Sequence, residues 1–316
     1  MIRPDRYSRL EVDPEDVKRS PLIGIHLLPS AATLANLICG FLAIYCCILS
    51  IRVAFFADTP LKLASPKLLS FFAPTWVAAG AVLIVLAMVF DVLDGRLARI
   101  TRRTSEFGSQ LDSIADIVSF GAAPPLLLLT TLLPLVAPGA SEPDLWVKLQ
   151  WRASMVCGLV FVSCAAIRLA RYNAENIHGE STQKTFSGLP VPGAAAAFVA
   201  LLVLYEDLKL PEESLLGMDW SFVLRWLIPP AIFGLGMLMV SRLDYLHIVN
   251  IYVRRKQPPM HLIWLLIAAG IGWYSPQVLL VVIAGAYVLS GPILGRRALQ
   301  LAEASSPART SKVDVN

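Results

Sequence analysis

The chain has 316 residues, of which 56% are hydrophobic and 16% are charged, and its mean hydropathy is +0.64. This composition, with its repeated long apolar runs, excludes an ordinary soluble domain and indicates a polytopic membrane protein. The net charge of +4 is too small and too dispersed to indicate a polyanionic partner by itself.

The first 20 residues are polar and lack the apolar core of a signal peptide, so we expect residues 1–25 to be a retained cytosolic arm. The apolar runs that follow predict an all-α bundle of about eight membrane helices. Most are near the ~20 residues needed to cross about 30 Å of hydrocarbon, although the seventh is short. The predicted helices are 26–50, 74–101, 108–137, 152–172, 188–205, 221–240, 260–273 and 275–295.

Lysine and arginine are distributed unequally between the two sets of connections. Nineteen lie in the segments on the side of the two termini, and six lie in the opposite connections. Because cytosolic loops carry the excess of positive charge, we expect both termini and the loop at 99–107 to be cytosolic. The polar tail, 296–316, is expected to be disordered.

Four aspartates lie where the second predicted helix ends and the third begins: Asp91, Asp94, Asp112 and Asp116. An unpaired aspartate at the bilayer centre costs roughly 2.5–3.5 kcal/mol, so four would cost on the order of 10 kcal/mol. The spacings i,i+3 and i,i+4 put each pair on one helical face. Measured from the turn near 102–107, the two pairs lie at matched distances along antiparallel helices. The sequence therefore predicts a carboxylate cage near the cytosolic edge of the membrane.

Ligands that are all carboxylates favour hard cations such as Mg²⁺ or Mn²⁺ over zinc, which prefers histidine and cysteine. Two such ions can clamp a phosphoryl group, and a carboxylate left free can take a proton from an attacking hydroxyl. The residues alone do not identify which carboxylate is the base. Salt bridges to nearby arginines are the alternative, but they would account for one or two aspartates, not four at matched depths. Those arginines are Arg96, Arg99, Arg102 and Arg103.

Small residues surround the aspartates. Gly95 and Ala98 share the face of Asp91 and Asp94, and Gly108 lies on the facing helix. Such residues either leave room for a bulky ligand or let two helices approach closely. Beside four aspartates, we favour ligand access.

Four further polar residues are candidates for binding. Arg168 and Arg171, spaced i,i+3 at the cytosolic end of the fourth helix, can bind oxyanions through their guanidinium groups. Anchoring of a helix end by positive charge is the alternative for both. Thr33 and Asn36 in the first helix either reach a ligand or hydrogen-bond between helices, and we favour the second.

One stretch of 26 residues resembles the sequence pattern of the CDP-alcohol phosphotransferase family, with every fixed position filled. The segments 27–45, 119–125, 168–173 and 186–195 resemble the branch of that family that makes phosphatidylserine. In the first helix this chain has Pro29-Ser30 where the family usually has Pro-Asn. The stretch reads Asp91-x2-Asp94-Gly95-x2-Ala98-Arg99-x8-Gly108-x3-Asp112-x3-Asp116.

The resemblance implies a homodimeric membrane enzyme of phospholipid biosynthesis, in the inner membrane of a bacterium with its site facing the cytosol. It would use two Mg²⁺ or Mn²⁺ ions to transfer the phosphatidyl group of CDP-diacylglycerol to L-serine, releasing CMP. Asp116 would be the general base, and Arg168 and Arg171 would bind the lipid phosphate or the serine carboxylate. By position, the metal ligands would be Asp91, Asp94, Asp112 and Asp116, and the residues bordering the cytidine diphosphate would be Gly95, Ala98, Arg99 and Gly108.

The implied organisation is a cytosolic arm (1–25), a six-helix catalytic core (26–240), two additional helices with a preceding cytosolic loop (241–295) and a tail (296–316). Glycerol phosphate, inositol phosphate and choline stay open as acceptors for the same chemistry. A divalent-cation transporter is the alternative of a different class, but it would place polar residues in both halves of the bilayer. A catalytically silent scaffold is disfavoured by the intact pattern of four aspartates.

Overall fold

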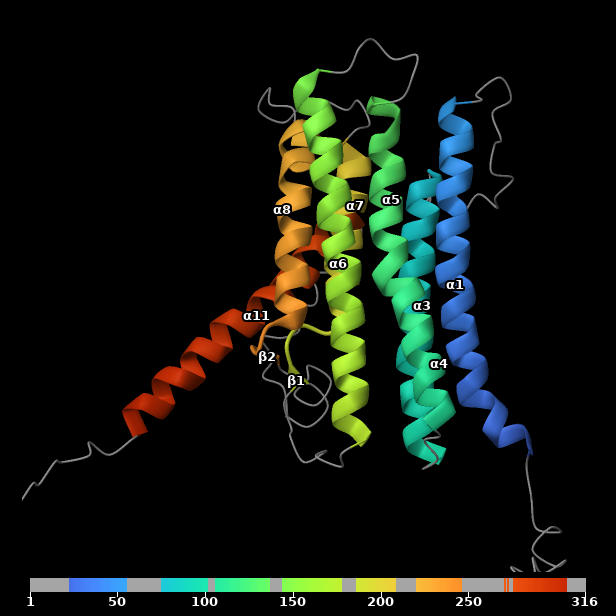
Figure 1. Ribbon diagram of the computed structural model, residues 1–316, viewed down its shortest axis with the longest axis vertical. Coiled ribbons are helices and arrows are strands. Elements are labelled where there is room, and N and C mark those ends of the chain that lie inside the picture. The colour runs from blue at the N-terminus through green and yellow to red at the C-terminus, as the bar shows by residue number, and fades with distance from the viewer. Residues whose placement is uncertain are drawn as a thin grey trace, which may run out of the picture.

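A computed structural model describes most of the chain, and most of its helices run side by side along one long axis (Figure 1). Seven of the described helices are long and apolar enough to cross a membrane. The protein is therefore an integral multi-pass membrane protein, and the expected all-α bundle is confirmed. The described residues are 23–55, 75–101, 106–136, 144–177, 186–208, 220–245, 270, 272 and 275–305.

Six long helices account for most of the bundle, and the remaining predicted span is built from four successive pieces. The long helices are α1 (Ile23–Phe55), α3 (Trp76–Thr101), α6 (Leu145–Ile177), α7 (Val191–Leu208), α8 (Trp220–Val240) and α11 (Pro276–Ser305). The four pieces are α4 (Glu106–Asp116), the π-helix η2 (Ile117–Ala122), α5 (Ala123–Leu132) and the 3₁₀-helix η3 (Leu133–Leu135).

Some expectations fall outside the described residues. These are the arm as far as residue 22, the turn at 102–105 and nearly all of the expected helix 260–273. Helix α11 continues to Ser305, through the first part of the segment expected to be a disordered tail. Residues 296–303, RRALQLAE, are mostly strong helix formers, which explains the longer helix.

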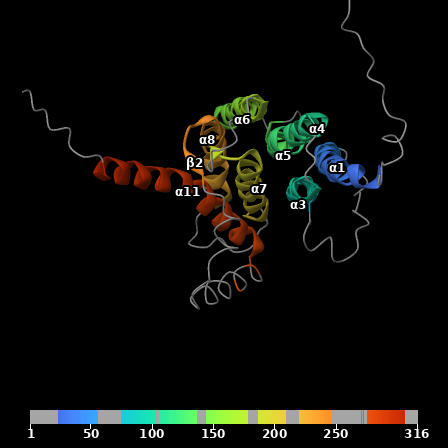
Figure 2. The same ribbon diagram turned by 90° about the horizontal axis from the view of Figure 1, so that it is seen from below.

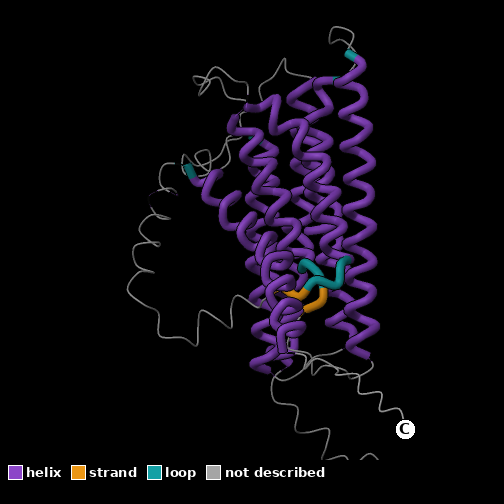
Figure 3. Tube along the Cα trace, turned by 90° about the vertical axis from the view of Figure 1, so that its left-hand side faces the viewer, coloured by secondary structure: helices purple, strands orange, loops and turns teal. Residues whose placement is uncertain are grey.

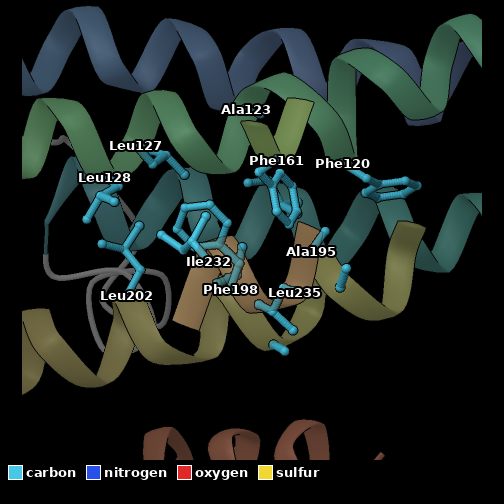
Figure 4. Close-up of a cluster of buried hydrophobic side chains, with 14 of the residues drawn as sticks. Phe120, Ala123, Leu127, Leu128, Phe161, Ala195, Phe198, Leu202, Ile232 and Leu235 are labelled. Carbon is cyan, nitrogen blue, oxygen red and sulfur yellow. The ribbon is translucent and has the colours of Figure 1, made fainter. Parts of the chain in front are cut away.

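The core lies where two groups of helices meet. Seen along the bundle, α1, α3, α4 and α5 form one group, and α6, α7, α8 and α11 form the other (Figure 2). Apolar side chains of η2, α5, α6, α7 and α8 fill the space between them (Figure 4). The rings of Phe161 and Phe198 meet edge to face there, with centroids 5.3 Å apart. Large apolar side chains also cover the outside, among them Phe41 and Leu159, as expected for a surface that faces lipid.

The hydrogen-bond register changes in the middle of the third span. Ala123 donates its N–H to the carbonyl of Val118, five residues back, at the end of the π-helix η2. Pro124 and Pro125 follow and have no N–H to give to the carbonyls four residues before them. We attribute the register change to these prolines. The wider turn begins directly after Asp116, one of the predicted site residues.

Helix α8 contains Pro229 and Pro230, which the structure accommodates through a neighbouring helix. Pro229 cannot donate an N–H to the carbonyl of Arg225, four residues earlier. The buried side chain of Gln150 in α6 donates to that carbonyl instead, at 2.8 Å. A side chain of a neighbouring helix thus satisfies the backbone group that the proline leaves unpaired.

Two short strands, β1 (Phe186–Ser187) and β2 (Asp244–Tyr245), pair antiparallel (Figure 3) and lie beside the end of α8 (Figure 1). Gly188 follows β1 with φ of +87°, and a Cβ there would lie 2.6 Å from the Met239 carbonyl oxygen, so only glycine fits. Tyr245 connects this junction to α11, since its hydroxyl donates to the Val288 carbonyl at 3.2 Å.

Candidate active site

The last turns of α3 and the whole of α4 bring three of the four predicted aspartates together. Carboxylate oxygens of Asp91, Asp112 and Asp116, one from each, all lie within 4.8 Å of one another. Asp116 is buried, whereas Asp91 and Asp112 are partly exposed. The helical spacings predicted a shared face for each pair of aspartates, and the structure brings members of both pairs together. The turn between the two helices lies outside the described residues.

Asp94 is buried but lies outside this group of three ligand oxygens. The hydroxyl of Thr33 in α1 is hydrogen-bonded to the Asp94 carboxylate, and Asp112 lies close enough to repel the negative charge of Asp94. Helix α1 thus covers the face of α3 that carries Asp94. The depths in the membrane that the sequence predicts for the four aspartates do not indicate that Asp94 lies apart from the other three.

The acidic cluster has unsatisfied acceptor atoms. Oδ2 of Asp94 and Oδ1 of Asp112 are buried and have no hydrogen-bond partner within the described part of the chain. Buried acceptors of this kind, next to further carboxylates, are suited to a hard divalent cation. Of the four nearby arginines, Arg96 is the one whose side chain is described, and it is exposed. The acceptor oxygens of the described aspartates therefore fit Mg²⁺ or Mn²⁺.

Helix α1 contacts the acidic helix through Asn36, which is fully buried. Its side-chain Nδ2 donates to Oδ1 of Asp116 at 3.1 Å. The hydroxyl of Ser119 donates to the backbone carbonyl of Asn36 at 3.0 Å. Gly40 lies one turn further along α1, and a Cβ there would lie 2.7 Å from Cα of Ser119. The absence of a side chain at Gly40 is what lets α1 approach η2 this closely.

A second hydrogen bond approaches the cluster from α6. Nδ2 of Asn173 donates to the hydroxyl oxygen of Ser113, the residue after Asp112, at 2.9 Å. The sequence pattern does not predict that Ser113 and Asn173 form a pair. The position of Asn173 in the segment 168–173 was the only available indication, because nothing local relates it to a residue 60 positions away.

The structure describes only some of the other predicted site residues in full. Gly95 and Gly108 are partly exposed near the aspartates in sequence, and the side chains of Ala98 and Arg99 lie outside those that the structure describes. The two arginines of α6 are placed as follows: Nη1 of Arg168 donates to the carbonyl of Met239 at the end of α8, at 3.0 Å, and Arg171 is exposed.

Comparison with known proteins identifies relatives over most of the chain. The family model described as CDP-alcohol phosphatidyltransferase matches residues 26–235. The CDP-diacylglycerol--serine O-phosphatidyltransferase of Mycobacterium tuberculosis is 29% identical over 230 residues, 71% of each chain. That of Helicobacter pylori is 31% identical over 67% of this chain and 77% of its own. That of Methanocaldococcus jannaschii is 38% identical over 39% of this chain and 49% of its own.

Proposed function

The chain belongs to the CDP-alcohol phosphatidyltransferase family, and from that premise we propose that it transfers the phosphatidyl group of CDP-diacylglycerol to L-serine. The products are phosphatidylserine and CMP. The observation that carries the proposal is the group of carboxylate oxygens from α3 and α4 that lie within 4.8 Å of one another in a membrane bundle of this family. The printed names of the relatives support serine over other acceptors.

The aspartates hold two divalent ions, Mg²⁺ or Mn²⁺, in this proposal. The ligands are Asp91, Asp94, Asp112 and Asp116, with Asp94 contributing through its unpartnered oxygen. When bound, the ions neutralise negative charge on the phosphates of the donor and on the departing CMP. Burial of several carboxylates in one cluster is unfavourable without such positive charge, which supports this assignment.

Asp116 is proposed as the general base. It takes the proton of the serine hydroxyl, the hydroxyl oxygen attacks the lipid-side phosphorus, and the bond from that phosphorus to CMP breaks. Proton transfer of this kind contributes typically about 10²–10⁴-fold to a rate. Asp116 is buried and accepts a hydrogen bond from Asn36, so the direction of its carboxylate is restrained.

The remaining predicted residues are assigned to the substrates. Gly95, Ala98, Arg99 and Gly108 border the cytidine diphosphate, where small residues leave room for the nucleotide. Arg168 and Arg171 bind the lipid phosphate or the serine carboxylate through their guanidinium groups. Nη1 of Arg168 donates to the Met239 carbonyl, which fixes this guanidinium at the end of α8.

We further propose a homodimer in the inner membrane of a bacterium, with the acidic site facing the cytosol. Two observations support this orientation: the excess of basic residues in the connections on the side of the termini, and the position of α4, which carries Asp112 and Asp116, at the end of the bundle where α1 begins (Figure 1). A nucleotide-activated lipid has both acyl chains and a polar head, which suits a site near the membrane surface.

The test is CMP release by the purified protein in detergent micelles with CDP-diacylglycerol, Mg²⁺ or Mn²⁺, and a panel of acceptors. The panel consists of L-serine, glycerol phosphate, inositol phosphate and choline. We expect CMP and labelled lipid with serine and no turnover after EDTA treatment. Release of CMP with a different acceptor would correct the substrate, and no CMP with any acceptor would contradict the phosphatidyltransferase assignment.

A further inference from the structure

Asn36 of α1 makes two hydrogen bonds to the third span. One reaches Asp116 at the end of α4, and the other reaches Ser119 in η2, where the backbone hydrogen-bond register has changed. The side chain of Asn36 donates to Asp116, and its carbonyl accepts from Ser119 in the π-helix η2. Asn36 and Ser119 are fully buried, and Asp116 is nearly so. The backbone of Asn36 is therefore fixed to η2 by one contact while its amide reaches Asp116 by the other.

The chemistry of an amide differs from that of the alternatives at this position. An amide N–H can orient a carboxylate, but it carries no charge and cannot take a proton from the attacking hydroxyl itself. An arginine or lysine in its place would neutralise the carboxylate and weaken it as a proton acceptor. Asparagine therefore orients the Asp116 carboxylate without neutralising its negative charge, so the carboxylate can still accept a proton.

The amide oxygen of Asn36 indicates that this residue does more than join two helices. Its Oδ1 atom is buried and has no hydrogen-bond partner among the described residues. A buried acceptor left unpaired is unfavourable, and a purely structural asparagine would be expected to satisfy both ends of its side chain. Turning the amide to use Oδ1 would point one acceptor at another, namely the Asp116 carboxylate.

We propose that Asn36 is a positioning residue for the base: its Nδ2 holds Oδ1 of Asp116 and thereby leaves the second carboxylate oxygen to accept the proton of the acceptor hydroxyl. The assignment rests on the proposed function of Asp116. It adds a residue of α1, 80 positions away in the sequence, to the catalytic arrangement.

The experiment compares Asn36→Leu with Gln150→Leu. Both replace a buried amide by an apolar side chain of similar size, and each removes one side-chain hydrogen bond, but Gln150 bonds to α8 at the opposite end of the bundle. At saturating Mn²⁺ and serine, we expect Asn36→Leu to lower kcat roughly 10–100-fold, the usual effect of losing a residue that orients a functional group. The KM for CDP-diacylglycerol should stay within about twofold of wild type. Gln150→Leu should lower thermal stability but leave kcat unchanged.

Binding of Mn²⁺, followed by its electron paramagnetic resonance spectrum, gives a readout that does not depend on turnover. Asn36→Leu should still bind the ion, because Asp91, Asp94 and Asp112 do not depend on this hydrogen bond. Wild-type kcat in Asn36→Leu, an equal loss of kcat in Gln150→Leu, or loss of Mn²⁺ binding would each overturn the proposal. If Asn36→Leu does not fold, Asn36→Ala carries the same expectations. An inactive wild type would instead count against the proposed function alone.

Discussion

At the scale of single residues, the acidic cluster is governed by charge. Asp91, Asp112 and Asp116 place three carboxylates within 4.8 Å of one another, and Asp94 is buried close by. Like charges at such distances repel, and the repulsion is stronger where water is excluded. A bound divalent cation should therefore stabilise the folded protein as well as serve the reaction.

Metal binding should raise the temperature of thermal unfolding. A ligand present at 100 times its dissociation constant stabilises the native state by about 2.7 kcal/mol. We expect Mn²⁺ to shift unfolding in detergent micelles upward relative to NaCl of equal ionic strength. Asp112→Asn removes one of the clustered carboxylates and should lose most of the shift. An equal shift in that variant would mean that the ion binds elsewhere.

Substitution of the proposed base should separate chemistry from binding. Asp116→Asn keeps the size of the side chain but cannot accept the hydroxyl proton, so we expect kcat to fall by about 10²–10⁴-fold. Binding of a CDP-diacylglycerol analogue, measured by titration, should persist because the other three aspartates remain. Full activity in this variant would remove Asp116 as the base.

At the scale of secondary-structure elements, the close approach of α1 to η2 decides the geometry of the site. Gly40 and Ser119 meet where α1 crosses η2, beside the Asn36 hydrogen bonds. The π-helix itself follows from Pro124 and Pro125, which remove two backbone donors. The two prolines thus determine the backbone conformation of η2, and α1 packs closely against η2 in that conformation.

Gly40→Ala should push these elements apart. Its Cβ would lie 2.7 Å from the backbone Cα of Ser119, which cannot move aside as a flexible side chain can. We expect a loss of stability of about 1–3 kcal/mol, measured by thermal unfolding, together with reduced activity. Gly234→Ala is the matched control, because a Cβ there meets nothing within 4 Å. Equal effects of the two substitutions would contradict the role given to Gly40.

The proline turn of α8 permits a rescue experiment. Gln150→Leu leaves the Arg225 carbonyl without its partner and should cost roughly 1–3 kcal/mol of stability. Pro229→Ala returns an N–H four residues after Arg225, so it should restore part of that loss when combined with Gln150→Leu. A double-mutant cycle of unfolding temperatures measures the coupling. Additive effects would show that the carbonyl does not need either partner.

At the scale of the whole molecule, the bundle alternates in direction, and α4, which carries Asp112 and Asp116, lies at the end where α1 begins (Figure 1). The helices α3 and α4 meet at this end, and α6 and α8 finish there. The basic residues of the connections are concentrated on the same side. The distribution of charge and the position of the site therefore point to one face of the membrane.

Cysteine labelling tests this topology. In a cysteine-free background, we expect Glu106→Cys to react with a membrane-impermeant maleimide only in inside-out vesicles, since α4 begins at the cytosolic end in the proposed orientation. Asp144→Cys, just before α6, should react in intact cells whose outer membrane is permeabilised. The reverse pattern would invert the bundle and remove the cytosolic site.

Much of the site was predictable because its signals are local. The spacings within the pairs Asp91–Asp94 and Asp112–Asp116 place each pair on one helical face, whatever the rest of the chain does. The expectation that Thr33 and Asn36 bond between helices is confirmed, since Thr33 contacts Asp94 of α3 and Asn36 contacts Asp116 of α4. The π-helix was not expected, because hydropathy describes residues 108–137 as one uninterrupted apolar run.

The sequence by itself determined the class of the molecule, the approximate limits of its spans and the four acidic positions, since helix periodicity and hydropathy depend on neighbouring residues only. The tertiary structure decided which carboxylates cluster, that Asp94 lies outside the group of three, and that Asn36 and Asn173 reach the acidic helix. These contacts join residues 60 and 80 positions apart. They depend on how closely whole helices approach, which is set by packing at positions such as Gly40 and not by any local pattern.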